Sequence, residues 1–416
     1  MSLNEPPIDS TSTSPRSPST APFPWVGLIA LASAVFLSVT SEMVPTGLLP
    51  DMSRSLEVTE AQIGLLVTYF AVTVVVTSTP LTALTRRVSR HAMVVAVLVV
   101  LAISNALTAI APNYEFVVAS RVLGGLAHGL FWSIVGAYAG HLVPKAQIGR
   151  AVSVALSGGS IAFVLGIPIG TGAGHAFGWR LTFVGLGVLM LIGAVVIWYF
   201  LPAVDRAEPV RRTAAADGTR ARRDTSIVPV LLVCTITALI MIGHYSFYTY
   251  IAPFLIDEFG VSEGAIGPLL FGYGIAGVVG LILAGSVLGR RPQLGLILAM
   301  VVTGVAVAAT SLLTGVFVLG IGAFLVWGAA FGALPPLMQT RLLHTASASF
   351  RDTASAVYTT AFNIGIGGGA LVGAIVFDAF GVARLPWVYV GVVVVALVLA
   401  VRTDQITRRR ELSSAL

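Results

Sequence analysis

Charged side chains are scarce in this sequence. Asp, Glu, Lys and Arg make up 10% of its 416 residues, whereas about 25% is usual for a soluble globular domain. Hydrophobic residues make up 56%, and the mean hydropathy is +0.93. These values exclude an ordinary soluble protein and indicate an integral membrane protein.

Several chemical motifs are also lacking. Cys234 is the one cysteine, so a disulfide framework is excluded. The sequence has no HExxH, no His, Asp or Glu cluster with metal-ligand spacing and no nucleophile paired with a base, so we predict neither an enzyme nor a metal or cofactor site. It has no G-x-x-x-x-G-K-[ST] loop and too few charges in its apolar runs for a ring-type ion filter. Any transport must therefore draw on a gradient.

Long apolar runs dominate what is present. A helix needs about 20 residues to cross about 30 Å of hydrocarbon. Twelve runs reach this length, and they centre near residues 37, 73, 101, 129, 161, 190, 240, 276, 303, 328, 366 and 392. An outer-membrane barrel would instead show alternating segments of about ten residues. The sequence thus predicts an all-α membrane protein with twelve transmembrane helices.

Lys and Arg are distributed unevenly around these runs. If both termini are cytoplasmic, twenty of the 24 fall on the cytoplasmic side, and Arg54, Arg180 and Arg384 fall on the other. Because the cytoplasmic side retains these residues, we expect a multi-pass protein of the cytoplasmic membrane with both termini inside. The formal charge of +6 follows from this topology, so we expect no nucleic-acid partner. The expected environment is the lipid bilayer, with the chain as a monomer.

The chain divides into two copies of one unit. VTEAQIG at 58–64 recurs 203 residues later as VSEGAIG at 261–267. Two parallel six-helix halves are the arrangement of major facilitator transporters, which bind substrate between the halves near the midplane. We predict a disordered cytoplasmic tail over 1–24, an N-terminal six-helix bundle over 25–201, an Arg-rich cytoplasmic linker over 202–226, a C-terminal six-helix bundle over 227–401 and a basic cytoplasmic tail over 402–416.

Three motifs narrow this comparison. They are EMVPTGLLP at 42–50, RVLGGLAHGLFW at 121–132 and GGSIAFVLGIPIGT at 158–171. With them, the chain over about residues 25–400 resembles the twelve-helix drug:proton antiporter family of the major facilitators, and most of all its arabinose-efflux and chloramphenicol-resistance branch. The resemblance implies proton-coupled export of a small molecule by alternating access.

The loop after the second span departs from the pattern of that family. It reads TALTRRVSRH at 82–91, where Thr82, Arg86 and Ser89 replace a Gly, an Asp and a second Gly, while Arg87 and Arg90 are kept. The aspartate to which the family assigns a gating role is therefore missing. Because fold does not fix function, this departure leaves open a transporter-like sensor or a lipid-handling protein.

Glu42 and Arg121 are the only charges inside the predicted spans. A continuous helix to Leu49 would place Glu42 about 10 Å from the outer end, and Arg121 would lie about 7–8 Å inward. Burial favours the neutral form of a carboxyl group and a nearby guanidinium favours the charged form. Such a carboxyl can carry a proton and couple binding to protonation. The alternatives are a fixed Glu42–Arg121 ion pair and a neutral Glu42 bonded to a neighbouring helix.

His128 lies on the same helical stripe as Arg121 and Trp132. An imidazole has an ordinary pKa of about 6.5, which suits a proton relay, and an interhelical hydrogen bond is the alternative. We therefore group His128 with Glu42 and Arg121 as candidate proton-coupling residues.

The fifth span carries small residues and a proline. Gly158, Gly166 and Gly170 allow another helix to approach closely, and Pro168 removes a backbone donor and should kink the helix. We assign these four residues a hinge or packing role.

Aromatic side chains suggest an apolar substrate cavity. The candidates to line it are Phe131, Trp132, His244, Tyr245, Tyr248, Phe331, Tyr358 and Phe362, with the amides Asn105 and Asn363. A sugar site needs several placed hydrogen-bonding groups, and two amides are few. The set favours an amphipathic compound of drug size, such as a phenicol, over the alternative of a sugar or another small metabolite.

Overall fold

The computed structural model describes residues 23–85, 87–144, 147–201, 224, 226–347 and 350–414. Most of the predicted N-terminal tail and linker lies outside these residues. Within them, twelve helices are long and apolar enough to cross a membrane, and each contains one of the predicted centres. The described residues form no strand. The all-α class and the twelve spans are therefore confirmed.

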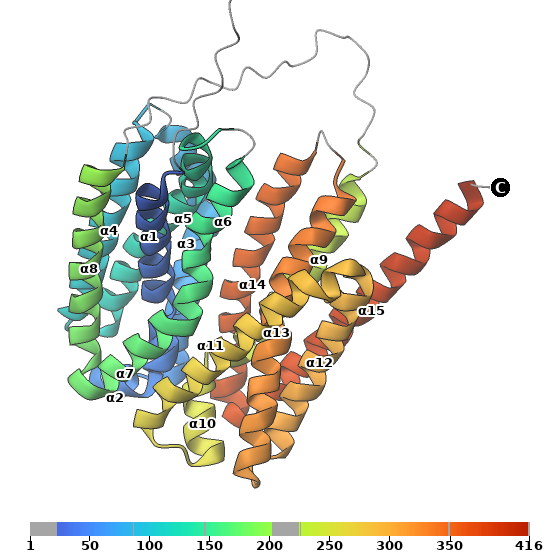
Figure 1. Cartoon of the computed structure of the whole chain (residues 1–416). Helices are drawn as coiled ribbons and strands as arrows, with labels where there is room; N and C mark the ends of the chain where they lie inside the picture. The colour runs from blue at the N-terminus through green and yellow to red at the C-terminus, as the bar shows by residue number, and fades with distance from the viewer. Residues whose placement is uncertain are drawn as a thin grey trace, which may run out of the picture.

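Each half consists of a first span, a short helix and five further spans, and the halves differ in their short turns and in the fifth span, which is divided in the first half only (Figure 1). The N-terminal half consists of α1 (Trp25–Met43), η1 (Val44–Gly47), α2 (Leu49–Leu56), α3 (Glu60–Leu84), α4 (Arg90–Ala109), α5 (Tyr114–His141), α6 (Ile148–Ile161), η3 (Ala162–Gly166), α7 (Ile167–Phe177) and α8 (Trp179–Phe200). The C-terminal half consists of α9 (Ile227–Tyr248), α10 (Ile251–Phe259), α11 (Glu263–Ser286), η4 (Leu288–Arg290), α12 (Pro292–Leu312), α13 (Phe317–Thr345), α14 (Arg351–Phe380), η5 (Val382–Arg384) and α15 (Leu385–Ser414).

The repeated heptapeptide marks the start of the second span in each half. In the first copy, Thr59 and Gln62 form a capping box: Gln62 N donates to Thr59 Oγ1 at 3.1 Å, and Thr59 N donates to Gln62 Oε1 at 2.9 Å. In the second copy, Ser262 occupies the same cap position before α11. A short helix precedes each cap, α2 in the first half and α10 in the second. These two helices define the α2–α10 end of the bundle. The opposite end, where α8 stops and α9 starts, is called the linker end.

Pro45 ends the first span earlier than the sequence suggests. The expected continuous helix to Leu49 is wrong, because α1 ends at Met43 and a 3₁₀ turn follows through Gly47. Proline has no backbone N–H, so Pro45 cannot donate to the carbonyl of Ser41 four residues earlier. The chain therefore leaves α geometry after Met43, one residue beyond Glu42, and the Ser41 carbonyl in the last turn of α1 lacks its usual donor.

The fifth span packs closely against α1 through its glycines. A Cβ on Gly158 would collide with the Ala32 backbone, and one on Gly166 would collide with Thr40. Five residues of this span, Ala162–Gly166, form a π-helical turn that ends two residues before Pro168. A π turn is a known way to accommodate a proline that cannot donate to the preceding turn. The fifth span is thus irregular close to its proline.

The two halves meet toward the α2–α10 end. Thr68 Oγ1 of α3 donates to the Gly367 carbonyl of α14 at 2.9 Å, and Arg54 Nη2 of α2 bonds Glu263 Oε1 of α11 at 2.7 Å. A Cβ on Gly267 of α11 would lie 3.1 Å from the Pro168 carbonyl of α7. Toward the linker end, the ribbons of the two halves diverge (Figure 1).

Candidate functional site

Glu42 lies in the interior of the N-terminal half. It is 4% exposed, and its Oε2 lies 3.4 Å from Nε2 of His128, which is 3% exposed. The other ring nitrogen, Nδ1, lies 2.7 Å from Ser38 Oγ. If the Ser38 hydroxyl donates to Nδ1, the ring proton sits on Nε2 and faces the carboxyl group. Within the described part of the chain, Glu42 Oε1 has no hydrogen-bond partner. The first and fourth spans thus hold a buried Ser–His–Glu chain.

Arg121 binds the end of α1 through its backbone. Its Nη1 and Nη2 donate to the carbonyls of Ser41 and Glu42, each at 2.9 Å, and its Cζ lies 4.5 Å from the ring centre of Phe70. The Ser41 carbonyl is the one that Pro45 leaves without its usual donor. Arg121 is 1% exposed, and a cation at the C-terminal end of a helix is favourable. Its contact with Glu42 is to the backbone, so the fixed carboxylate–guanidinium ion pair considered from the sequence is not what the described residues form.

Asn105 supports the same end of α1 from α4. Its Oδ1 accepts from Ser41 Oγ at 2.9 Å, and its Nδ2 donates to the Leu101 carbonyl at 2.7 Å. It is 1% exposed, so its amide is engaged inside the N-terminal half. Two side chains that the sequence interpretation passed over, Ser38 and Ser41, take part in these contacts. Ser38 precedes Glu42 by four residues, and this helical spacing was the available signal.

The remaining candidates on α5 differ in burial. Phe131 is fully buried. Trp132 is partly buried, and its ring centre lies 6.0 Å from that of His128. Trp132 is therefore the α5 aromatic residue that combines contact with the Ser–His–Glu chain and partial exposure.

An aromatic cluster fills the corresponding region of the C-terminal half. His244 stacks on Phe331 with ring centres 3.3 Å apart, and the ring centres of Tyr245 and Tyr248 both lie 5.0 Å from that of His244. Trp327 joins this cluster at 5.6 Å from His244. Three members, Trp327, Tyr389 and Tyr273, were not predicted from the sequence, because they come from three separate spans. The predicted residues His244, Tyr245, Tyr248 and Phe331 thus lie together, mostly as packed side chains.

The α14 candidates lie apart from this cluster. Tyr358 OH donates to the Pro335 carbonyl at 3.3 Å, and its ring centre lies 6.2 Å from that of Phe362. Asn363 donates to the Thr359 carbonyl at 2.9 Å. Asn363 also lines a cavity of about 200 Å³ between α14 and α3, to which Thr68 contributes from the other half.

A polar cluster joins the halves at the α2–α10 end. Arg54 binds Asp51 Oδ1 at 2.6 Å and Glu263 at 2.7 Å, and His175 Nδ1 lies 2.7 Å from Asp51 Oδ2. The hydrogen bond to Glu263 raises the pKa of Arg54, and the Coulomb attraction of both carboxylates adds to the shift. Ligand atoms of Asp51, His175 and Glu263 lie within 4.8 Å of one another. The Arg54 guanidinium already supplies positive charge to the carboxylates of Asp51 and Glu263 in this group.

The loop between α3 and α4 is described except for Arg86. Arg87 is exposed and Arg90 is partly buried at the first residue of α4. Ser89 caps that helix by accepting from Ala92 N at 3.2 Å. Ser89 stands where the related pattern has its second glycine, and here it acts as a helix cap.

Comparison with known proteins places the chain in a family. The sequence pattern of the Major Facilitator Superfamily matches residues 31–367 and 233–414. The chain belongs to the Major Facilitator Superfamily. A chloramphenicol efflux pump of Mycobacterium tuberculosis is 34% identical over 373 residues, which cover 85% of this chain and 88% of the pump. A probable sugar efflux transporter of Mannheimia succiniciproducens is 32% identical, over 89% of this chain and 91% of that protein.

Solved structures of other transporters share the fold. A D-xylose–proton symporter superposes with a TM-score of 0.76 at 15% identity, covering 91% of this chain and 97% of the symporter. A bacterial homolog of the human lysosomal transporter Spinster, in an inward-facing and unoccupied conformation, gives a TM-score of 0.70 at 17% identity, covering 92% and 96%. At these identities the likeness concerns the fold alone.

Proposed function

We propose that this major facilitator is a proton-coupled exporter of small amphipathic compounds, in which Glu42 carries the proton. The observation that supports this most is the buried Ser38–His128–Glu42 chain, in which one carboxyl oxygen faces the imidazole. An ionisable group within a membrane span is costly and usually functional. A hydrogen-bonded chain that includes an imidazole also offers a path for the proton.

Arg121 links protonation to the shape of α1. Its guanidinium donates to the backbone carbonyls of Ser41 and Glu42, where α1 ends. The Arg121 cation is therefore attached to the same helix end that carries the Glu42 carboxyl group. A movement of this helix end changes the distance between the cation and the carboxyl group. Because a cation favours the charged carboxylate, such a movement shifts the protonation of Glu42, and protonation in turn biases the helix end.

The packing of the halves is consistent with alternating access. The halves are joined toward the α2–α10 end, and their ribbons diverge toward the linker end (Figure 1). The excess of Lys and Arg predicts that the linker end faces the cytoplasm, so in this proposal the contacts between the halves lie toward the outer side of the membrane. Rocking of one half against the other would close the linker end and open the α2–α10 end.

The proposed substrate class rests on the aromatic side chains and on one relative. His244 and Phe331 belong to an aromatic cluster in which the ring centre of Tyr248 lies 6.5 Å from that of Phe163 in the other half, and Asn105 uses its amide inside the protein. Aromatic faces suit an apolar ring system better than a sugar's hydroxyl groups. The chloramphenicol efflux pump among the relatives points the same way. The sugar efflux relative supports the alternative substrate class.

The test is substrate-driven proton movement in proteoliposomes, with chloramphenicol, cationic dyes and pentoses as the panel. The wild type should move protons with at least one compound of the first two groups. Glu42→Gln should abolish this movement, and His128→Phe should weaken the coupling within the range of about 5- to 150-fold that is typical of linked sites. Glu115→Gln is the matched control, because Glu115 is an exposed residue of the same half.

Each outcome decides between the alternatives. Proton movement with pentoses alone would establish sugar efflux. Proton exchange at the native rate in Glu42→Gln would show that Glu42 is structural. Binding without any solute or proton movement would favour a sensor.

A further inference from the structure

Tyr250 fills the seam between the two halves at the α2–α10 end. It follows the end of α9 as the residue before the first turn of α10, and it is fully buried. A Cβ on Gly64 of α3 would collide with its hydroxyl and one edge of its ring, and a Cβ on Gly373 of α14 would collide with the opposite edge. The ring is therefore held between a glycine of each half.

The polar end of Tyr250 is fixed to its own half. Its OH donates to the Ala370 carbonyl of α14 at 2.8 Å, and its ring centre lies 5.5 Å from that of Phe377, also on α14. A buried tyrosine hydroxyl requires such a partner. If α3 moves away from α14, this hydrogen bond stays intact and the ring remains with the C-terminal half. The contact that breaks is the van der Waals contact with Gly64.

Gly64 is the last residue of the first heptapeptide copy. Its counterpart in the second copy, Gly267, also lies where the halves meet, because a Cβ there would approach the Pro168 carbonyl to 3.1 Å. The repeat thus uses one glycine of each copy to bring the halves together. The residue 203 positions before Tyr250 is Gly47, which has no side chain. The aromatic ring in this seam is therefore a property of the C-terminal half.

The buried ring differs from the ion pair at the same end. Arg54 and Glu263 have side chains that are 62% and 41% exposed, and an exposed pair contributes little to the free energy. Tyr250 is 0% exposed, and burial of an aromatic ring removes a large apolar area from water. Separation of α3 from the ring therefore costs more than separation of the exposed charges.

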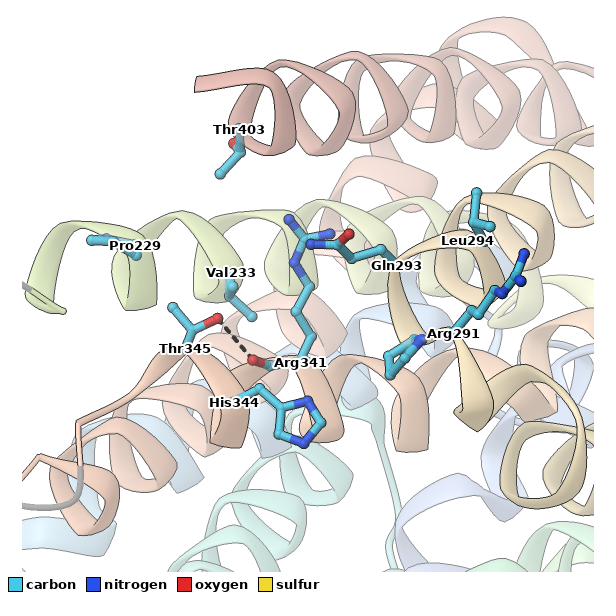
Figure 2. A pocket seen from close by; sticks show the side chains of 10 residues that line it. Pro229, Val233, Arg291, Gln293, Leu294, Arg341, His344, Thr345 and Thr403 are labelled. Carbon is cyan, nitrogen blue, oxygen red and sulfur yellow. Dashed lines mark hydrogen bonds between the residues drawn. The ribbon is translucent and has the colours of Figure 1, made fainter. Parts of the chain in front are cut away.

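The opposite end of the C-terminal half is more open. There, α9, α12, α13 and α15 surround a cavity of about 620 Å³, and Figure 2 shows Pro229 and Val233 of α9 beside it. The same helix leads at its other end to Tyr250. The C-terminal half is thus hollow at the linker end and tightly packed where it meets α3.

We propose that Tyr250 is a gating residue of the transport cycle. Its ring closes the α2–α10 end by packing against Gly64, and that end opens when α3 moves away from the ring. The inference rests on the rocking of the halves proposed above. It requires neither a particular substrate nor proton coupling.

The experiment measures the distance between spin labels on α2 and α10 in the full chain in lipid nanodiscs. The buried Cys234 is replaced by serine so that label attaches to the introduced cysteines alone. Gly64→Ala places a methyl group against the ring in the closed arrangement only. We expect it to raise the ratio of open to closed molecules by about 5- to 150-fold, the factor that corresponds to typical overpacking.

Two alanine variants are matched controls. Gly264→Ala is at the same end, on α11, and a Cβ there meets nothing within 4 Å, so the distances should stay as in the wild type. Gly369→Ala forces a Cβ to 2.6 Å from the Ile242 carbonyl within the C-terminal half. It should lower the temperature of unfolding without shifting the distances, because both arrangements contain that contact.

A second change tests whether Tyr250 is the partner. Adding Tyr250→Leu to Gly64→Ala should reverse most of the shift, because the smaller side chain leaves room for the methyl group. Should Gly64→Ala fail to fold, Tyr250→Leu alone replaces it. Loss of the ring beside Gly64 should then shift the ratio toward the open arrangement as well.

The outcomes separate the gate from the rocking motion. A longer distance that Gly64→Ala populates no more than Gly264→Ala does would overturn the role of Tyr250 and leave the rocking motion in place. A shift that Tyr250→Leu does not reverse would also overturn it. If neither the wild type nor any variant shows a longer distance, the rocking motion itself is refuted at this end, and the gate with it.

Discussion

In the N-terminal half, Glu42, Arg121 and His128 lie together within the membrane, and 203 residues later the C-terminal half carries Tyr245, Phe324 and Phe331. The second set belongs to a packed aromatic region: Phe331 stacks on His244, and Phe324 lies 4.9 Å from Tyr273 between ring centres. Apolar rings gain free energy on burial without any hydrogen-bond partner, whereas buried ionisable groups require hydrogen-bond or ion-pair partners. The duplication therefore kept one scaffold and placed the ionisable chemistry in one copy.

Pro45 explains why the arginine occurs in one half only. Pro45 leaves the Ser41 carbonyl without its helical donor, and Arg121 donates a hydrogen bond to that carbonyl instead. The residue 203 positions after Pro45 is Tyr248, which keeps its N–H, and α9 continues to that residue. The second half has no such carbonyl at this position, and its counterpart of Arg121 is the apolar Phe324.

Close packing of helices is what the halves do share. A Cβ on Gly166 would collide with Thr40 of α1, and a Cβ on its counterpart Gly369 would lie 2.6 Å from the Ile242 carbonyl of α9. In both halves, the glycine lets the fifth span of the unit approach its first span. The repeat thus preserves the distance between backbones and lets the buried polar chemistry differ.

Removing the arginine should have the largest effect on stability. Arg121→Met leaves two buried carbonyls without their donor, at about 1–3 kcal/mol each, so we expect a loss of about 2–6 kcal/mol in the free energy of unfolding. The counterpart change Phe324→Met keeps an apolar side chain and should cost less than about 1.5 kcal/mol. Thermal unfolding in one detergent compares the two variants.

A double mutant tests the proposed reason. Pro45→Ala restores an N–H that can donate to the Ser41 carbonyl, so adding it to Arg121→Met should recover about 1 kcal/mol. If the double variant loses the sum of the unfolding free energies that the two single variants lose, Arg121 does not act through that carbonyl. The contrast between the halves would then need another cause.

The glycine pair should show equal effects in the two halves. Gly166→Ala and Gly369→Ala each force a methyl group into a helix contact, at about 1–3 kcal/mol for overpacking. Gly172→Ala is the control, because a Cβ there meets nothing within 4 Å, and alanine is the better helix former by about 1 kcal/mol. Thermal unfolding of the three variants checks this. A cost confined to one half would contradict the shared packing.

The sequence was sufficient for the spans and the duplication. Apolar runs of membrane length and the repeated heptapeptide predict both, because hydrocarbon thickness sets the length of a helix and the heptapeptide marks a helix start. The break in α1 after Met43 was missed, although Pro45 was visible and its missing N–H gives the physical reason.

The candidate site was only partly accessible from the sequence. Glu42, Arg121 and His128 stand out because ionisable groups are rare in spans, and the structure brings them together on α1 and α5. The acceptors of Arg121 are backbone carbonyls, which no residue letter records. Trp327, Tyr389 and Tyr273 look like ordinary apolar positions in their own helices, and only the packing of separate spans gathers them around His244.

The ion pair between the halves should have the smallest effect. Arg54 and Glu263 have side chains that are 62% and 41% exposed, and exposed pairs contribute about 0–1 kcal/mol. Glu263→Gln should therefore shift the balance between conformations by about fivefold or less, toward opening of the α2–α10 end. The measurement is the distance between spin labels on α2 and α10, with Glu57→Gln as the control because it removes an exposed carboxylate from the same end. Raising the salt concentration should shrink the difference, since screening weakens an exposed pair. An unchanged distance distribution would mean that the close packing of α7 against α11 at Pro168 and Gly267 holds this end closed without the ion pair.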